Sequence, residues 1–208
     1  MSIFKTKELW SYSNATQETY TTRSLAFYPS ENILASKFKT SLIFTASVEG
    51  QLRLFHAVLQ ASNTDGLLLE LDLKLPILQI DVGNFSSGGR GPQIAVLHPR
   101  QLAVYSLVKS TSSKESSKGI EGFQMNLIYQ HKLSRAAYSM CSGTFGGVHN
   151  KDYICVQSID GTLNLFENES FSFSRFLPGF LLPGPIAYVS KTDSFVTVSA
   201  SFQLESYR

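Results

Sequence analysis

Few residues in this sequence are placed to do chemistry. The four histidines, His56, His98, His131 and His149, have no metal-ligand spacing, and neither H-E-x-x-H nor C-x-x-C occurs. There is no G-x-S-x-G nucleophile elbow, and the glycine cluster at 86–92 lacks the G-K-[ST] ending of a phosphate-binding loop. We therefore expect no catalytic residue, no metal site, no cofactor and no enzymatic activity.

The two cysteines, Cys141 and Cys155, are predicted to be reduced and buried. They fall on neighbouring strands of one predicted sheet, and a thiol among apolar side chains behaves as a small hydrophobic group. No secretory signal opens the sequence, so an oxidising compartment is not indicated. We interpret the chain as intracellular.

One run of residues is suited to binding a partner. The segment RFLPGFLLPGP, which begins at Arg175, is too apolar for an ordinary surface loop. Either the neighbouring strands cover it, or it presents Phe176 and Phe180 to another protein, since large exposed apolar patches mark interfaces. The candidate partner surface consists of Arg175, Phe176, Pro178 and Phe180.

The composition favours a β-rich globular domain. Apolar residues make up 43% of the 208 residues and charged residues 16%, with 15 Phe and 9 Tyr. The net charge of +2 is too small to drive binding to nucleic acid or to an anionic membrane surface. The most apolar stretch, 176–187, contains three prolines and is far shorter than the ~20 residues that span a bilayer, so no direct membrane insertion is expected.

One pattern occurs four times along the chain. Each copy is a β-branched and aromatic run, a short polar turn and a Leu-x-x-aromatic ending. The copies are SLIFTASVEGQLRLF (41–55), PQIAVLHPRQLAVY (92–105), DYICVQSIDGTLNLF (152–166) and DSFVTVSASFQLESY (193–207). Gly50 and Gly161 in the turns are free to adopt positive φ, which tight hairpins need. Each copy therefore predicts an antiparallel hairpin.

Two further strands fit around each hairpin. Apolar runs precede the hairpins at 24–28, 77–82, 136–141 and 185–190, and others follow three of them at 67–73, 123–130 and 172–176. Four strands in every ~40–60 residues are typical of β-propeller blades. The prediction is an all-β fold, a partial β-propeller of about four blades of four antiparallel strands, with the last blade incomplete.

The blades are placed roughly at 24–73, 77–130, 136–176 and 185–208, and the Ser/Lys-rich segment 109–122 is predicted to be a flexible insert. We interpret 1–208 as the amino-terminal part of a propeller domain, which leaves apolar faces open on the first and last blades. The alternative is a complete four-bladed ring whose final outer strand comes from the amino terminus, around Glu18 to Thr21.

Several long segments carry a family resemblance. They are MSIFKTKELWS at the start, LLLELDLKLPILQIDVGNF (67–85), IAVLHPRQLAVYS (94–106) and the run from SGTFGGVHNKDYICVQ to SASFQLESY (142–207). In these segments the sequence resembles the family of parathyroid-hormone-responsive Bardet-Biedl syndrome proteins, which are BBSome subunits. The resemblance covers most of the chain and is weak at 12–40 and 108–122.

This resemblance implies the amino-terminal part of a seven-bladed propeller. It also implies a non-enzymatic scaffold of the BBSome, a coat-like complex that carries membrane proteins into and out of cilia. The expected partners are other BBSome subunits, built from propellers and helical repeats, with membrane-protein cargo held indirectly and no nucleic acid. The expected locations are the cytoplasm, the cilium and its base, the ciliary membrane and the centriolar satellites. The alternatives are a propeller binding module of another intracellular complex and, less favoured, an enzyme built on a propeller.

Overall fold

The computed structural model describes residues 10–13, 17–29, 42–56, 66–89, 91–109, 122–179 and 181–208. These residues form β-strands and one short 3₁₀ turn, η2 (Phe145–Gly147). They include no helix with the length and apolarity needed to cross a membrane. Apart from its two end residues, the predicted insert at 109–122 lies outside the described residues.

The strands form four antiparallel sheets. The first contains β1 (Leu25–Tyr28), β2 (Leu42–Ala46), β3 (Gln51–His56) and β4 (Leu67–Asp72). The second contains β5 (Gln79–Gly83), β6 (Gln93–His98), β7 (Gln101–Lys109) and β8 (Phe123–Lys132). The third contains β9 (Ala137–Gly143), β10 (Tyr153–Ser158), β11 (Leu163–Glu167) and β12 (Ser170–Arg175), and the fourth contains β13 (Leu181–Val189), β14 (Ser194–Ser199) and β15 (Leu204–Tyr207).

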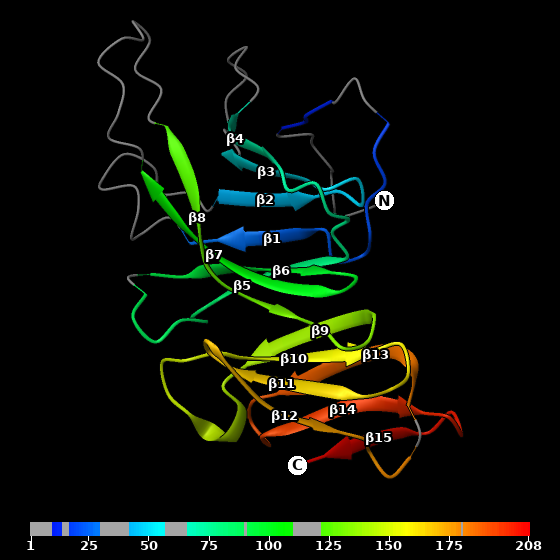
Figure 1. The fold of residues 1–208 in the computed structure, drawn as a ribbon. Coiled ribbons are helices and arrows are strands. Elements are labelled where there is room, and N and C mark those ends of the chain that lie inside the picture. The colour runs from blue at the N-terminus through cyan, green and yellow to red at the C-terminus, as the bar shows by residue number, and fades with distance from the viewer. Residues whose placement is uncertain are drawn as a thin grey trace, which may run out of the picture.

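In each sheet the strands lie side by side in chain order, as in propeller blades. The described part of the fourth blade has three strands where the others have four. The predicted all-β, partial propeller with an incomplete last blade is therefore confirmed. Figure 1 shows the first sheet in the upper part of the view, the second in the middle, and the third and fourth overlapping in the lower part.

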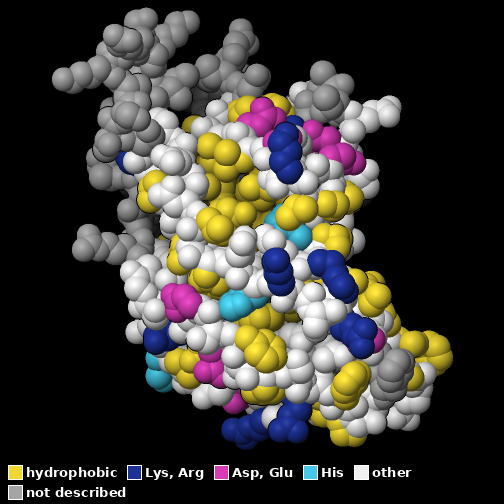
Figure 2. All heavy atoms as spheres, in the orientation of Figure 1, with side chains coloured by type: hydrophobic (Ala, Val, Ile, Leu, Met, Phe, Trp, Pro, Cys, Tyr) yellow, Lys and Arg dark blue, Asp and Glu magenta, His cyan; other side chains and the backbone are white. Residues whose placement is uncertain are grey.

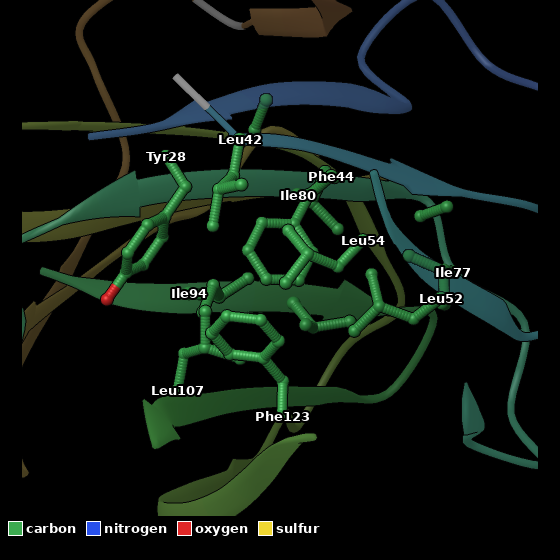
Figure 3. Close-up of a cluster of buried hydrophobic side chains, with 13 residues drawn as sticks. Tyr28, Leu42, Phe44, Leu52, Leu54, Ile77, Ile80, Ile94, Leu107 and Phe123 are labelled. Carbon is green, nitrogen blue, oxygen red and sulfur yellow. The ribbon is translucent and has the colours of Figure 1, made fainter. Parts of the chain in front are cut away.

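The apolar core lies between consecutive sheets. The first sheet packs against the second through Tyr28, Phe44 and Leu54 on one side and Ile80 and Ile94 on the other (Figure 3). All five side chains are at most 3% exposed. Similar clusters join the second sheet to the third and the third to the fourth. Because the middle sheets are apolar on both faces, a blade of this type is stabilised by neighbours on both sides.

The Leu-x-x-aromatic endings lie on the third strand of each sheet, where positions three apart face opposite sides. Leu52, Leu102 and Leu163 belong to the clusters shared with the following blade. Phe166 belongs to the cluster shared with the preceding blade, and Tyr105 packs against such a cluster. The interfaces of the second blade with the first and with the third therefore combine a leucine from one blade with an aromatic ring from the next.

The turn between the second and third strands has one backbone geometry in three of the sheets. Gly50, Gly161 and Phe202 occupy its left-handed position with φ of 99°, 81° and 60°, and each amide bonds to the carbonyl three residues earlier. A Cβ on Gly50 would lie 2.8 Å from the carbonyl oxygen of Leu75, so the first turn has no room for a side chain. The fourth turn has room, because the Phe202 side chain is 83% exposed.

Replacing Phe202 by glycine is expected to raise the free energy of unfolding by about 0.5–1 kcal/mol. An L-residue held in the left-handed region is strained by roughly 1–2 kcal/mol, which exceeds the extra chain entropy that glycine brings to the unfolded state. Urea denaturation measures the change. Gly50→Ala is the control and is expected to have the opposite sign, since it adds both strain and a close contact. Loss of stability in Phe202→Gly would mean that the exposed ring makes stabilising contacts.

Part of the outer face of the first blade, at β3, is covered by the start of the chain. The rings of Trp10 and Tyr12 lie 5.4 and 4.7 Å from that of Phe55, which is only 2% exposed. The expected open apolar face is therefore covered at Phe55 on β3 but present at β1, where Leu25 and Phe27 are 55% and 64% exposed. The fourth blade does have an open face, since Leu204 is 77% exposed.

The alternative of a four-bladed ring closed by Glu18 to Thr21 is wrong. These residues are not in a strand and do not lie beside β15. The Thr19 amide donates to the Glu49 carboxylate, and the Thr19 carbonyl accepts from the Val48 amide. This segment therefore runs along the turn between β2 and β3 of the first blade.

Candidate interaction surface

The outer strand of the third blade, β12, is exposed along its whole length. It pairs with β11 on one edge, and its other edge has no strand beside it in the described part of the chain. The hydroxyls of Ser172 and Ser174 donate to the side chains of Glu167 and Asn164, which fixes one side of the hairpin. A free strand edge offers unpaired N–H and C=O groups to another protein.

Three residues of the candidate partner surface lie just after this strand or at its end. Arg175, Phe176 and Pro178 are exposed, and Phe176 reaches 65%. Leu177 packs against the cluster between the third and fourth blades and so anchors the segment. Phe180 lies outside the described residues. The neighbouring strands therefore do not cover Phe176, and its use in partner binding remains a prediction.

Two further aromatic rings extend this surface along β12. Phe171 and Phe173 are 53% and 43% exposed, and the Arg175 guanidinium lies 5.8 Å from the centre of the Phe173 ring, within cation–π range. We call Phe171, Phe173, Arg175 and Phe176 the β12 edge. The sequence analysis identified the last two and missed the first two, although the Ser-Phe alternation at 170–174 was the available signal.

The inner strands of all four blades begin around a hollow of about 400 Å³. Gln79 lines the hollow, but both ends of its side-chain amide are already hydrogen-bonded. The amide nitrogen donates to the Met140 carbonyl at 2.7 Å, and the amide oxygen accepts from the Met140 backbone amide at 2.9 Å. Arg23 also lines the hollow, with its guanidinium 3.5 Å from the same carbonyl. The described residues that line it include no carboxylate.

The cysteines lie directly opposite each other on β9 and β10. Cys141 is 5% exposed and Cys155 is fully buried, so their predicted burial is confirmed. The hydrogen bond to Cys141, together with burial, raises the pKa of the Cys155 thiol well above its usual value. A protonated, buried thiol is a poor nucleophile, and the pair serves the interface between the third and fourth blades.

Two of the histidines fill space between strands. The ring of His98 is 2% exposed, with Nδ1 2.8 Å from the Pro76 carbonyl oxygen. The ring of His131 makes tilted contacts with those of Tyr129 and Phe166, at centroid distances of 5.5 and 4.9 Å. Burial lowers the pKa of both imidazoles, which favours the neutral form of each ring. Among the residues that the structure describes, no group of three or more His, Cys, Asp or Glu side chains could hold a metal ion.

A buried ion cluster joins the start of the chain to the first blade. The Arg53 guanidinium bonds to both carboxylate oxygens of Glu18, at 2.6 and 2.7 Å, and to Glu70 at 2.7 Å. The side chains of Arg53 and Glu18 are 4% and 5% exposed. The hydrogen bond to Glu18 raises the pKa of Arg53. The cluster holds the amino-terminal segment against the first blade, and of its three side chains only Glu70 reaches solvent, at 48% exposed.

Basic side chains do not gather into one patch on the face shown in Figure 2. They lie at several separate places, with acidic side chains close to some of them. A nucleic-acid binding surface needs clustered Lys and Arg along the path of the phosphates. This face therefore offers no such path.

Two solved structures share the fold. The chain is similar to the structure titled "Crystal structure of BBS1N in complex with ARL6DN, soaked with mercury", with a TM-score of 0.52 and 12% identity over 80% of this chain and 46% of that one. It is also similar to the WD40 domain of SCAP from fission yeast, with a TM-score of 0.51 and 13% identity over 91% of this chain and 42% of that one. At these identities the similarity shows a propeller fold alone.

Relatives found by sequence have a higher identity to this chain than these two structures do. The whole chain aligns with "Protein PTHB1" of Xenopus laevis and of Homo sapiens at 45% identity, covering 24% and 23% of those proteins. It also aligns with the Caenorhabditis elegans homologue at 30% identity over 65% of the chain. The chain therefore spans about a quarter of the length of the first two relatives. Because the family described as PTHB1 N-terminal matches residues 1–208, the chain belongs to that family.

Proposed function

We propose that this chain is a non-enzymatic scaffold of the BBSome, the coat complex that carries membrane proteins to and from cilia. Its membership of the PTHB1 N-terminal family is the observation that carries the proposal. Its place of action would be the cytoplasm, the cilium and its base, the ciliary membrane and the centriolar satellites. Other BBSome subunits, built from propellers and helical repeats, are the proposed partners, and membrane-protein cargo is held through them.

The β12 edge is the surface that we assign to these contacts. Exposed aromatic rings and arginine are enriched among the residues that contribute most to binding energy, and a free strand edge adds main-chain hydrogen bonds. The edge combines all three features, with Phe176 the most exposed of its rings at 65%. The solved complex of BBS1N with ARL6DN supports protein binding by a propeller of this fold.

Replacing Phe176 by alanine in the full-length protein is expected to weaken binding of BBSome subunits by about tenfold or more, as loss of an aromatic anchor does. The stability of the protein should not change, because the ring is largely solvent-exposed. Quantitative co-purification with the other subunits measures the first effect, and thermal unfolding measures the second.

Leu127→Ala is the matched control for this experiment. Leu127 lies on β8, the outer strand of the second blade, and is 49% exposed. We expect normal recovery of the subunits with this variant. Equal recovery with Phe176→Ala would remove the β12 edge from the proposal. A stoichiometric metal together with hydrolase activity would overturn its non-enzymatic part.

A further inference from the structure

The hollow at the start of the inner strands lies where the central channel of a propeller opens. Its lining comes from the residues before β1 and from those at β5, β9 and β13, the inner strands of the other three blades. Inner strands surround the channel of a propeller. The volume of about 400 Å³ is within the range of pockets that bind small groups. The hollow is therefore large enough to take a side chain of another molecule.

Arg23 brings to this hollow a positive charge that the described residues do not neutralise. Its guanidinium makes one long contact, 3.5 Å to the Met140 carbonyl oxygen, and forms no ion pair with a described carboxylate. Asp81 shares a smaller neighbouring hollow with Arg23, but its carboxylate accepts a hydrogen bond from the Ser142 hydroxyl at 2.6 Å. A guanidinium without a carboxylate partner favours a ligand of negative charge.

Two hydroxyl groups add neutral donors around the same hollow. Thr22 and Tyr138 both line it, and both side chains are exposed. Neither side chain makes a hydrogen bond to another described residue. Both hydroxyls are therefore available to a ligand that accepts hydrogen bonds.

The wall between the third and fourth blades contains a buried donor without a partner. The Gln157 side chain is fully buried, and its Oε1 accepts from the Ser139 hydroxyl at 3.2 Å and from the Gly184 amide at 3.4 Å. Both of these donors belong to residues that line the hollow. The Nε2 of Gln157 has no hydrogen-bond partner among the described residues. An unpaired buried donor costs about 1–3 kcal/mol, which an acceptor entering at this wall would offset.

We propose that this hollow binds a carboxylate from an acidic segment of another protein, with Arg23 as its charged partner and the hydroxyls of Thr22 and Tyr138 as further donors. A carboxylate accepts hydrogen bonds from all three groups. A phosphate group has similar chemistry but carries close to two charges at neutral pH. The single guanidinium at the hollow matches the one charge of a carboxylate. This site lies apart from the β12 edge and does not depend on it.

Fluorescence anisotropy of a labelled oligoglutamate peptide tests the proposal on the full-length protein. Arg23→Gln is expected to weaken binding of this peptide by about tenfold, the effect of losing one charge-assisted hydrogen bond. Tyr138→Phe removes a neutral donor and is expected to weaken binding by about threefold. An oligoglutamine peptide should not bind. Because both side chains are exposed, thermal unfolding of the two variants should match that of the unaltered protein.

Arg175→Gln is the matched control, since Arg175 is an exposed arginine on the outer strand β12. This variant should bind the peptide normally. If Arg175→Gln weakened binding and Arg23→Gln did not, the peptide would occupy the β12 edge and the proposal would be wrong. Absence of saturable binding, or equal affinity in Arg23→Gln, would also overturn it. Displacement of the peptide by inorganic phosphate, but not by chloride at equal ionic strength, would mean that the hollow takes a free anion instead of a protein segment.

Discussion

Replacing Phe166 by alanine is expected to lower the free energy of unfolding by about 3–5 kcal/mol, the usual effect of removing a buried aromatic ring. The ring is 3% exposed and lies within the cluster that joins the second and third blades. It contacts His131 on one side and Phe171 on the other, at centroid distances of 4.9 and 5.6 Å. Chemical denaturation followed by circular dichroism measures the loss.

Phe173→Ala is the matched control on the same hairpin. Phe173 is 43% exposed, so its removal should change stability by less than about 1 kcal/mol. A small effect for Phe166 would contradict the view that the interfaces between blades hold the fold together. A large effect for Phe173 would mean that the β12 edge is part of the core rather than a surface.

Replacing Glu18 by alanine is expected to destabilise the protein by about 3 kcal/mol, near the lower end of the range for breaking a buried ion pair. The Arg53 guanidinium would lose two hydrogen bonds while remaining almost excluded from water, with a side chain that is 4% exposed. Glu70 would still bond to its Nε, which limits the loss. Urea denaturation measures the change.

A second substitution distinguishes an unpaired charge from lost packing. Adding Arg53→Met to Glu18→Ala should restore much of the stability, because apolar replacement of a buried pair is often neutral. Lys74→Ala is the control, since the exposed pair of Lys74 and Asp72 should contribute at most about 1 kcal/mol. If the double variant were no more stable than Glu18→Ala, packing by the amino-terminal segment would be the main loss.

The sheets were predictable because hydrophobic patterning is local. The run at 152–166 shows apolar residues, an Asp-Gly turn and a Leu-x-x-Phe ending, and it became β10 and β11. The turn at Phe202 shows the limit of this reasoning. An aromatic residue gives no signal for a left-handed backbone, yet the fourth turn has the geometry of the turns that contain Gly50 and Gly161.

The covering of the first blade could not be predicted, because it depends on contacts across distant parts of the sequence. Nothing near Trp10 indicates that its partner is Phe55, and Glu18 is 35 residues away from Arg53. In the sequence, nothing distinguishes Arg53 from an ordinary charged residue in a strand. Its burial becomes intelligible only once the two carboxylates that satisfy it are known.

The candidate surface was predictable in part. Proline and glycine around Phe176 indicated a connection between blades with unusual apolar content, and that connection is exposed. The exposure of Phe171 and Phe173 depends on which strands lie beside β12. Sequence patterning defines the two sides of a strand but not whether a neighbour covers each side.

The opposed directions of the leucine and the aromatic residue in the third strand give the first two joints between blades the same form. Such a blade presents a leucine to the following blade and an aromatic ring to the preceding one, as Leu102 and Tyr105 do within a single strand. Two blades that share this form can follow each other with the same type of contact. A gene encoding them can therefore gain or lose one unit by duplication or deletion and still specify matching joints, with only the closing contact needing to adapt.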